Sequence, residues 1–308
     1  MADIAFIFHG RTKKRSSIFS AVEKTLGPSN RVKFFVTERT VNAFRLAELA
    51  VTEGFTHIIS IGGDGTLNEV ANGLMKAKQT MPDDRWRHVR MGGLPMGTGN
   101  DFLKTLEVPT DIHVFKRVLE ADSFKTIDLG LVEYTAISGV RATRYFINIT
   151  DLGMGGVVAE KLSRYSRWMG PLLTYQRAIL SALLTYKSQT INAAADSFTY
   201  DGEILNFVVA NGKYFGSGLG IAPHATIDDG QLSIVVLGKI SLLDYMKLLS
   251  KVRQCKPITH PAFYYKSAKE IRLDSPSGPL PIDMDGEFIG YSPMKVTVVP
   301  GALRFLCL

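Results

Sequence analysis

The sequence predicts an α/β N-terminal domain with a parallel sheet, followed by a larger β-rich C-terminal domain that is antiparallel and sandwich-like. Two observations support this prediction. Up to about residue 125, short β-forming runs alternate with helical patterns, which is typical of βαβ units. Beyond that point, β-forming runs follow one another with mainly turns between them, which favours antiparallel pairing.

Four β-forming runs and three helical patterns make up the N-terminal part. The expected strands, rich in Ile, Val and Phe, cover residues 4–8, 31–37, 57–63 and 89–97. Apolar residues at helical spacing place helices between them, at 16–26, 41–53 and 67–78.

The C-terminal part contains seven β-forming runs and two helical stretches. We expect strands within 125–134, 143–150, 197–212, 230–238, 270–275, 280–290 and 294–301. Helical patterns interrupt them at 157–187 and 241–254.

Composition limits the class of protein. The 308 residues are 45% hydrophobic and 21% charged, which suits about two globular domains. The net charge of +7 favours contact with phosphates, nucleic acid or anionic lipid, although no nucleic-acid-binding module is recognisable. Two cysteines fit no disulfide framework or zinc site, and no signal peptide or spanning segment is evident. We therefore expect a cytoplasmic protein.

A glycine-rich stretch follows the third expected strand. Residues 60–69 read SIGGDGTLNE, with three glycines around Asp64. Glycines let phosphates approach the backbone closely, whereas a carboxylate beside polyphosphate needs a cation such as Mg²⁺ between them. A helical pattern begins near Thr66, and Thr66 with Glu69 fits a T-x-x-E capping box. Capping alone is therefore the alternative interpretation.

Several ordered motifs carry a resemblance. They are GGDGTLNEVANGL at 62–74, LPMGTGNDF at 94–102, IDLG at 127–130, FINITDLGMGG at 146–156, YFGSGLGIAPHATIDDGQL at 214–232 and DMDGE at 283–287. In this order they resemble the diacylglycerol kinase catalytic family of soluble bacterial lipid kinases, which is related to sphingosine and ceramide kinases. NAD kinases share the GGDGT core.

The resemblance implies an NAD kinase/diacylglycerol kinase-like fold. A nucleotide-binding domain at 1–125 would be completed by residues 295–308, and a lipid-binding domain would span 126–294. ATP would lie between the two domains. The implied nucleotide-binding residues are Thr37, Gly63, Asp64, Gly65, Thr66, Leu67, Asn68, Glu69 and Thr98.

Two parts of this nucleotide site remain open. Asn100 and Asp101 either contact the ligand or are ordinary helix N-caps. His9 and Gly10 stand where the family has Asn-Pro, which weakens the inference for residues 9–13.

The same resemblance implies the remaining site residues. Glu287 would accept the proton of the lipid hydroxyl and, with Asp64, form the catalytic pair, whereas the alternative makes it simply the first residue after an Asp-Gly turn. Asp285 is either a turn former or a supporting group. A structural Mg²⁺ would be held by Asp229 with the carbonyl groups of Thr226 and Gln231, against the alternative of a plain turn.

Residues 161–195 contain no acidic residue and interleave basic with aromatic side chains. This pattern favours peripheral association with the inner face of the membrane, where a lipid substrate would be met. Helices that pack on the β-rich domain with basic outer faces are the alternative.

The prediction is thus an ATP- and Mg²⁺-dependent lipid kinase that phosphorylates a lipid hydroxyl such as that of diacylglycerol. The alternatives are an NAD kinase-like small-molecule kinase and a non-catalytic lipid- or nucleotide-binding protein of the same fold. The sequence leaves open which lipid is phosphorylated and whether the protein is a homodimer.

Overall fold

The computed structural model describes residues 2–10, 12, 15–38, 43–97, 99–165, 174, 177–178, 181–182 and 185–308. The chain divides into two compact units. Unit 1 comprises Met1–Asp128 and Gly301–Leu308, and unit 2 comprises Leu129–Pro300. The predicted order, an α/β unit followed by a β-rich unit, is confirmed.

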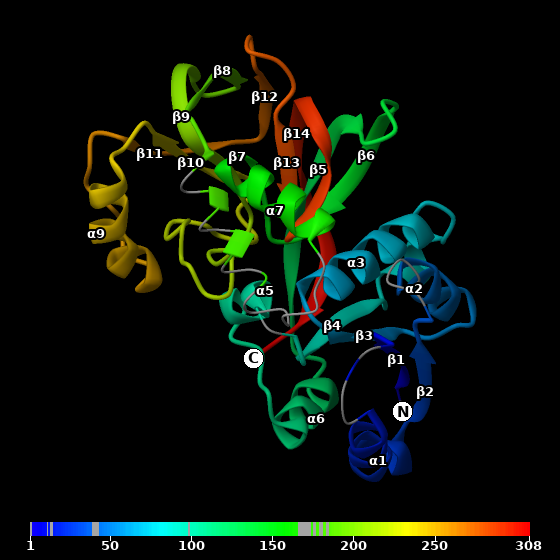
Figure 1. The fold of residues 1–308 in the computed structure, drawn as a ribbon. Helices are drawn as coiled ribbons and strands as arrows, with labels where there is room; N and C mark the ends of the chain where they lie inside the picture. The colour runs from blue at the N-terminus through cyan, green and yellow to red at the C-terminus, as the bar shows by residue number, and fades with distance from the viewer. Residues whose placement is uncertain are drawn as a thin grey trace. The chain divides into compact units, whose positions relative to one another are not determined.

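Unit 1 alternates strands with helices (Figure 1). Its strands are β1 (Asp3–Phe8), β2 (Arg31–Val36), β3 (His57–Gly62), β4 (Arg90–Pro95), the start of β5 (Phe124–Ala136) and the end of β14 (Glu287–Leu306). Its helices are α1 (Arg15–Leu26), the 3₁₀ turn η1 (Gly27–Ser29), α2 (Ala43–Thr52), α3 (Asp64–Lys78), α4 (Asp83–Trp86), α5 (Asp101–Thr105) and α6 (Ile112–Glu120).

The sheet of unit 1 has the strand order β2-β1-β3-β4-β14. Each neighbouring pair runs parallel. Strands β1 to β4 therefore end at the same edge, and the loops that follow them gather there. This edge holds the glycine-rich stretch.

Helices cover both faces of this sheet. On one face, α1 and α6 bury Leu26 and Phe115 against Phe6 and Phe8 of β1. Alternate residues such as Ile7 point to the opposite face, where α2 and α3 pack on the sheet and on each other. The apolar runs that predicted these strands are therefore buried on both faces of the sheet.

Unit 2 is built mainly from strands, with helices at its surface. Its strands are the rest of β5, β6 (Arg141–Phe146), β7 (Ile149–Gly153), β8 (Gln189–Ala195), β9 (Thr199–Ala210), β10 (Leu232–Gly238), β11 (Phe263–Ala268), β12 (Glu270–Asp274), β13 (Pro281–Met284) and most of β14. Its helices include α7 (Met154–Arg164) and α9 (Leu242–Arg253).

Antiparallel pairings in unit 2 close a ring of strands. Within this ring, the long strands β9 and β14 each pair with two strands, although β9 also pairs with β10, and β14 with β4 and β5. One half of each pairs with β7 or β13, and the other half with β8 or β12. Because β7 also pairs with β13 and β8 with β12, the strands enclose a common core.

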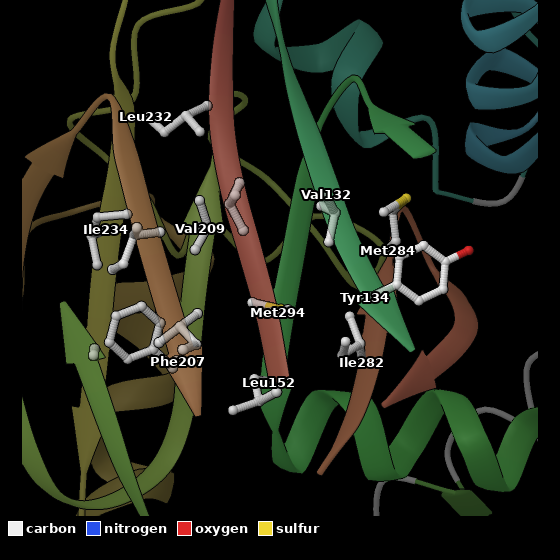
Figure 2. Packing of buried hydrophobic residues seen from close by; sticks show 14 of the residues in the cluster. Val132, Tyr134, Leu152, Phe207, Val209, Leu232, Ile234, Ile282, Met284 and Met294 are labelled. Carbon is white, nitrogen blue, oxygen red and sulfur yellow. The ribbon is translucent and has the colours of Figure 1, made fainter. Parts of the chain in front are cut away.

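The core of unit 2 comes from inward-facing residues of these strands. Figure 2 shows Phe207 and Val209 of β9 with Ile282 and Met284 of β13 and Met294 of β14. All five are buried, and each alternates with residues that point away from the core. Burial of this apolar surface is the main stabilising contribution to unit 2.

The helices predicted from apolar spacing are found with small shifts at their ends. The helix predicted at 67–78 begins earlier, at Asp64. The stretch predicted at 157–187 contains α7, and parts of its remainder lie outside the described residues. Among the helices of the described ranges, none has the length and apolar composition needed to cross a bilayer.

Candidate active site

The carboxyl edge of the unit 1 sheet has the topology of a ligand-binding crevice. Strands β1 and β3 are neighbours, but α1 and α3, which follow them, cover opposite faces. The two loops therefore part at this edge, which is where α/β sheets bind ligands. The N–H of His9 donates to the carbonyl of Ile61 at 3.1 Å, which anchors the loop after β1.

Helix α3 begins directly at the glycine-rich stretch. Its N-cap is Gly63, in an extended conformation (φ −99°, ψ −170°), and no side chain caps it. Asp64 is the first helical residue, so its carboxylate lies at the positive end of the helix dipole. Three successive residues, Gly63, Asp64 and Gly65, are partly exposed there.

The predicted capping box is wrong. Because the helix begins at Asp64, Thr66 already lies in its first turn and cannot be the N-cap. The carboxylate of Glu69 instead accepts the N–H of Ala43 at 3.1 Å, at the start of α2. Glu69 therefore caps a neighbouring helix. Residues 66–69, all predicted to bind the nucleotide, are buried.

The carboxylate of Asp64 joins two loops. Its Oδ1 accepts the N–H of Asp101 at 2.8 Å and, more weakly, that of Phe102 at 3.5 Å. It thereby satisfies the N-terminus of α5, which follows β4. The glycine-rich stretch is thus tied to the G-T-G-N-D motif through a side chain rather than through backbone contacts alone.

Asn100 occupies the N-cap position of α5, as the N-cap alternative has it, but its side chain makes no capping hydrogen bond. Asn100 is left-handed, with φ of 53°, and its amide closes a loop with Gly97. Gly97 in turn lies against Gly63, where a Cβ on Gly97 would collide with the Gly63 backbone. The glycines therefore allow two loops to approach each other. The predicted ligand Thr98 lies outside the described residues.

Electrostatics at Asp64 favour a nearby cation. Burial raises the pKa of Asp64 above its usual value, and the adjacent carboxylate of Asp101 raises it further, against backbone N–H donors that lower it. The carboxylate of Asp101, which is 4% exposed, lies 3.7 Å from the ammonium group of Lys104, whereas no ion pair joins Asp64 to a described residue. A hard cation with oxygen ligands such as Mg²⁺ fits this donor set.

Thr37 lies at the same edge, after β2. It is buried, and its Oγ1 accepts the N–H of Gly10 at 2.8 Å. Its own N–H donates to the carbonyl of Phe8 at 2.9 Å. Gly10, which differs from the motif of the resembling family, is therefore held against Thr37. A Cβ at Gly10 would collide with the Thr37 carbonyl, so glycine is required there.

In unit 2, Asp285 and Gly286 form the turn between β13 and β14, as predicted. Both have positive φ, 49° and 83°, as a two-residue hairpin turn requires. The Asp285 carboxylate accepts three backbone N–H groups, from Ile147, Asn148 and Ile149, at 2.9 to 3.1 Å. Asp285 therefore holds the β6–β7 connection in addition to forming the turn.

Glu287 is the first residue of β14 and follows this turn directly. Its Oε2 accepts a hydrogen bond from the guanidinium of Arg144 on β6 at 2.8 Å. The side chain of Glu287 is 42% exposed and that of Arg144 is 24% exposed, so the carboxylate is positioned but accessible. Sequence reasoning missed Arg144, because its partner is far away along the chain.

A second pair of acids, also missed, lies next to this turn. Asp151 of β7 is directly opposite Asp283 of β13 in the antiparallel register. Asp151 is fully buried under the first turn of α7, where a Cβ on Gly155 would collide with its carboxylate. Burial raises the pKa of Asp151 to about 7. Burial and then the charge of Asp151 raise the pKa of Asp283 well above its usual value.

This acid pair predicts an unusual pH dependence of stability. A carboxyl group whose folded pKa exceeds its unfolded value binds protons preferentially in the folded state. Its contribution is therefore most favourable below about pH 4 and is lost as pH rises through about 7. We expect Asp151→Asn to raise the free energy of unfolding at pH 8 by on the order of 2–4 kcal/mol.

Denaturant titrations of both proteins between pH 4.5 and 8.5 measure this difference. The gain should shrink towards pH 4.5, and Asp84→Asn, at an exposed position, should show no comparable trend. Equal stability of Asp151→Asn and the parent at pH 8 would show that the buried carboxyl carries no electrostatic cost.

The predicted structural metal site lies in the long connection between β9 and β10. Asp229 and Gln231 line one surface depression together with His224. The carboxylate of Asp229 accepts the N–H of Gln231 at 3.0 Å. Thr226 is exposed nearby along the chain. Among the described residues no cluster of three or more His, Cys, Asp or Glu has the geometry of a metal centre, so this site stays a prediction.

The basic and aromatic stretch at 161–187 is described only in part. Lys161 donates to the hydroxyls of Ser181 and Thr185, and Arg177 lies 4.8 Å from the ring centre of Tyr165. These cations engage neighbouring residues, which favours the alternative of helices that pack within the unit. Arg167, Trp168 and Tyr175 lie outside the described residues, and membrane contact by this stretch stays a prediction.

Comparison with known proteins decides the family. The diacylglycerol kinase catalytic domain matches residues 4–132, and the YegS C-terminal NAD kinase beta sandwich-like domain matches residues 149–307. A diacylglycerol kinase of Staphylococcus aureus (strain bovine RF122 / ET3-1) is 30% identical over 261 residues, which cover 84% of this chain and 76% of the relative. The chain belongs to the diacylglycerol kinase family. The predicted resemblance is confirmed.

Other relatives agree with this assignment. A diacylglycerol kinase of Staphylococcus haemolyticus (strain JCSC1435) is 29% identical over 260 residues, covering 84% of this chain and 73% of the relative. A solved diacylglycerol kinase structure from Bacillus anthracis str. Sterne superposes with a TM-score of 0.71 over 99% of this chain and 97% of that one. At 18% identity this superposition shows the shared fold.

Proposed function

We propose that this protein is an ATP-dependent lipid kinase that transfers the γ-phosphate of ATP to the free hydroxyl of diacylglycerol. Family membership supports the reaction, and the names of the relatives support the acceptor. The observation that carries the proposal is the carboxylate of Asp64, which lies at the start of α3 where two glycine-rich loops meet.

Unit 1 would bind the triphosphate at the carboxyl edge of its sheet. The start of α3 presents backbone N–H groups and the positive end of its dipole, both of which attract phosphate. Gly63, Asp64 and Gly65 are the partly exposed residues there. Thr37 holds the adjacent loop through its bond to Gly10. Thr98 belongs to the G-T-G-N-D motif, whose Asp101 is bonded to Asp64.

Asp64 would hold Mg²⁺, whose chemistry is to neutralise the phosphate charge and so favour phosphoryl transfer. The residues present fit this ion, because Asp64 is an oxygen ligand whose ionised form is disfavoured by burial and by the charge of Asp101. Asp64 itself does two things. It keeps α5 in place through the N–H of Asp101, and it contributes the negative charge that makes the site selective for a cation-bound nucleotide.

Glu287 would accept the proton of the lipid hydroxyl as that oxygen attacks the γ-phosphate. A general base must be accessible and held in one orientation, and both conditions are met by its partial exposure and its bond to Arg144. Asp285 would act indirectly, because its carboxylate fixes the turn that presents Glu287. Asp229, Thr226 and Gln231 would bind the structural Mg²⁺.

One assay tests this function against its rivals. The protein is incubated with labelled ATP, Mg²⁺ and, separately, diacylglycerol, phosphatidylglycerol, a sphingoid base, a polyprenol or NAD. We expect label in the product of diacylglycerol, at least about a hundredfold above the product of NAD. Transfer to NAD alone would establish the small-molecule kinase. Thermal protection by ATP with no labelled product from any acceptor would establish a non-catalytic binding protein.

A further inference from the structure

The β5–β6 hairpin of unit 2 ends in an exposed apolar tip. Ile137 and Val140 flank its turn and have 65% and 64% of their surface exposed. Among the large apolar side chains of the described residues, only the C-terminal Leu308 is more exposed. Figure 1 shows this loop, in green, standing clear of the adjacent strands.

The turn itself is built to present these two side chains. Residues 137–140 lie between the strands, and Gly139 adopts φ of 83°, which allows the chain to reverse. The N–H of Ala136 donates to the carbonyl of Val140 at 2.9 Å and closes the loop. Single exposed apolar residues are common, but two of them on one short, closed turn favour a contact surface.

Charge at the tip is positive. From Tyr134 to Phe146 the chain contains Arg141 and Arg144 and no acidic residue. Arg141 is exposed and follows the tip directly, and no ion pair joins it to a described carboxylate. The preceding acid on β5, Glu133, lies 3.9 Å from Lys295. An apolar tip beside an unpaired guanidinium complements a bilayer with anionic headgroups.

We propose that the tip formed by Ile137, Val140 and Arg141 inserts into the surface of an anionic bilayer. This inference rests on the proposed function, because a lipid kinase must meet its acceptor there. It also explains the arrangement of β6. Arg144 lies four residues after Val140, about 13 Å along an extended strand, and bonds to Glu287. A bilayer that holds the tip would thus lie close to the proposed base.

Vesicle binding by the full-length protein tests the proposal. Sedimentation is measured with phosphatidylcholine vesicles that contain or lack phosphatidylglycerol. The double variant Ile137→Ser/Val140→Ser should bind the anionic vesicles at least about tenfold more weakly than the parent protein. Arg141→Ser should remove most of the preference for anionic over neutral vesicles. Leu49→Ser, at an exposed aliphatic residue of α2, is the matched control and should change neither.

Activity separates this proposal from the proposed function. The double variant should lose phosphorylation of diacylglycerol in vesicles about tenfold, yet retain it towards a short-chain, monomeric diacylglycerol. Absence of kinase activity in the parent protein would contradict the proposed function while leaving the sedimentation result valid. Unchanged vesicle binding by the double variant would overturn the membrane proposal. So would conversion of a dimer to a monomer, since the tip would then be a contact between two copies.

Discussion

Asp64→Asn is expected to lower kcat for lipid phosphorylation by about 10³-fold or more while leaving the fold intact. The asparagine Oδ1 can still accept the N–H of Asp101, which the carboxylate accepts at 2.8 Å. Helix α5 therefore keeps its cap. The variant loses only the negative charge, and with it the means to hold Mg²⁺ beside the triphosphate. Steady-state kinetics and thermal unfolding measure the two effects separately.

Asp64→Ala provides the contrast for this experiment. It removes the cap as well as the charge, so it should lose about 1 kcal/mol of stability in addition to the activity. The two variants should therefore be equally inactive but differ in stability. If Asp64→Asn retains activity while Asp64→Ala loses stability, the residue is a structural cap and the assignment of a catalytic role is wrong.

The second large effect is expected at Glu287. Glu287→Gln should lower kcat by about 10²- to 10⁴-fold, because glutamine keeps the shape of the side chain but cannot accept the hydroxyl proton. The KM for ATP should change little, since the residue is proposed to act on the lipid hydroxyl. Kinetics with diacylglycerol dispersed in detergent micelles measure both quantities.

Arg144→Gln separates the base from its ion pair. The pair is partly exposed, so breaking it should cost no more than about 1 kcal/mol of stability. If Glu287 acts as a base, the arginine variant keeps most of its activity. If both variants lose activity equally, Glu287 serves to hold the hairpin and another group must take the proton.

Much of the fold follows from local patterns. Strands β1 to β4 were predicted from apolar runs, and the Asp-Gly turn before Glu287 from its residues, because both depend on short-range chemistry. The start of α3 was predicted two residues too late, at Thr66, because that prediction also used only local pattern. The T-x-x-E pattern predicts a cap within its own helix, but Glu69 caps α2 instead. No short-range rule reveals that partner.

Site residues that lie in recognisable motifs could be predicted from the sequence. Those that depend on contacts between distant segments could not. Asp64 and Glu287 lie in recognisable motifs. The partner of Asp64 on α5, the guanidinium beside Glu287 and the Asp151–Asp283 pair all arise from tertiary pairing across tens or more than a hundred residues. The sequence holds one weak signal for Asp151, which is the only charged residue of the strand Ile149–Gly153.

The most direct test of the account is a crystal structure with Mg²⁺ and a non-hydrolysable ATP analogue. We expect the triphosphate at the start of α3, with a magnesium ion bound by the Asp64 carboxylate directly or through one water molecule. A triphosphate bound away from the glycine-rich stretch, or an Asp64 side chain that keeps only its bonds to α5 beside a bound nucleotide, would contradict it.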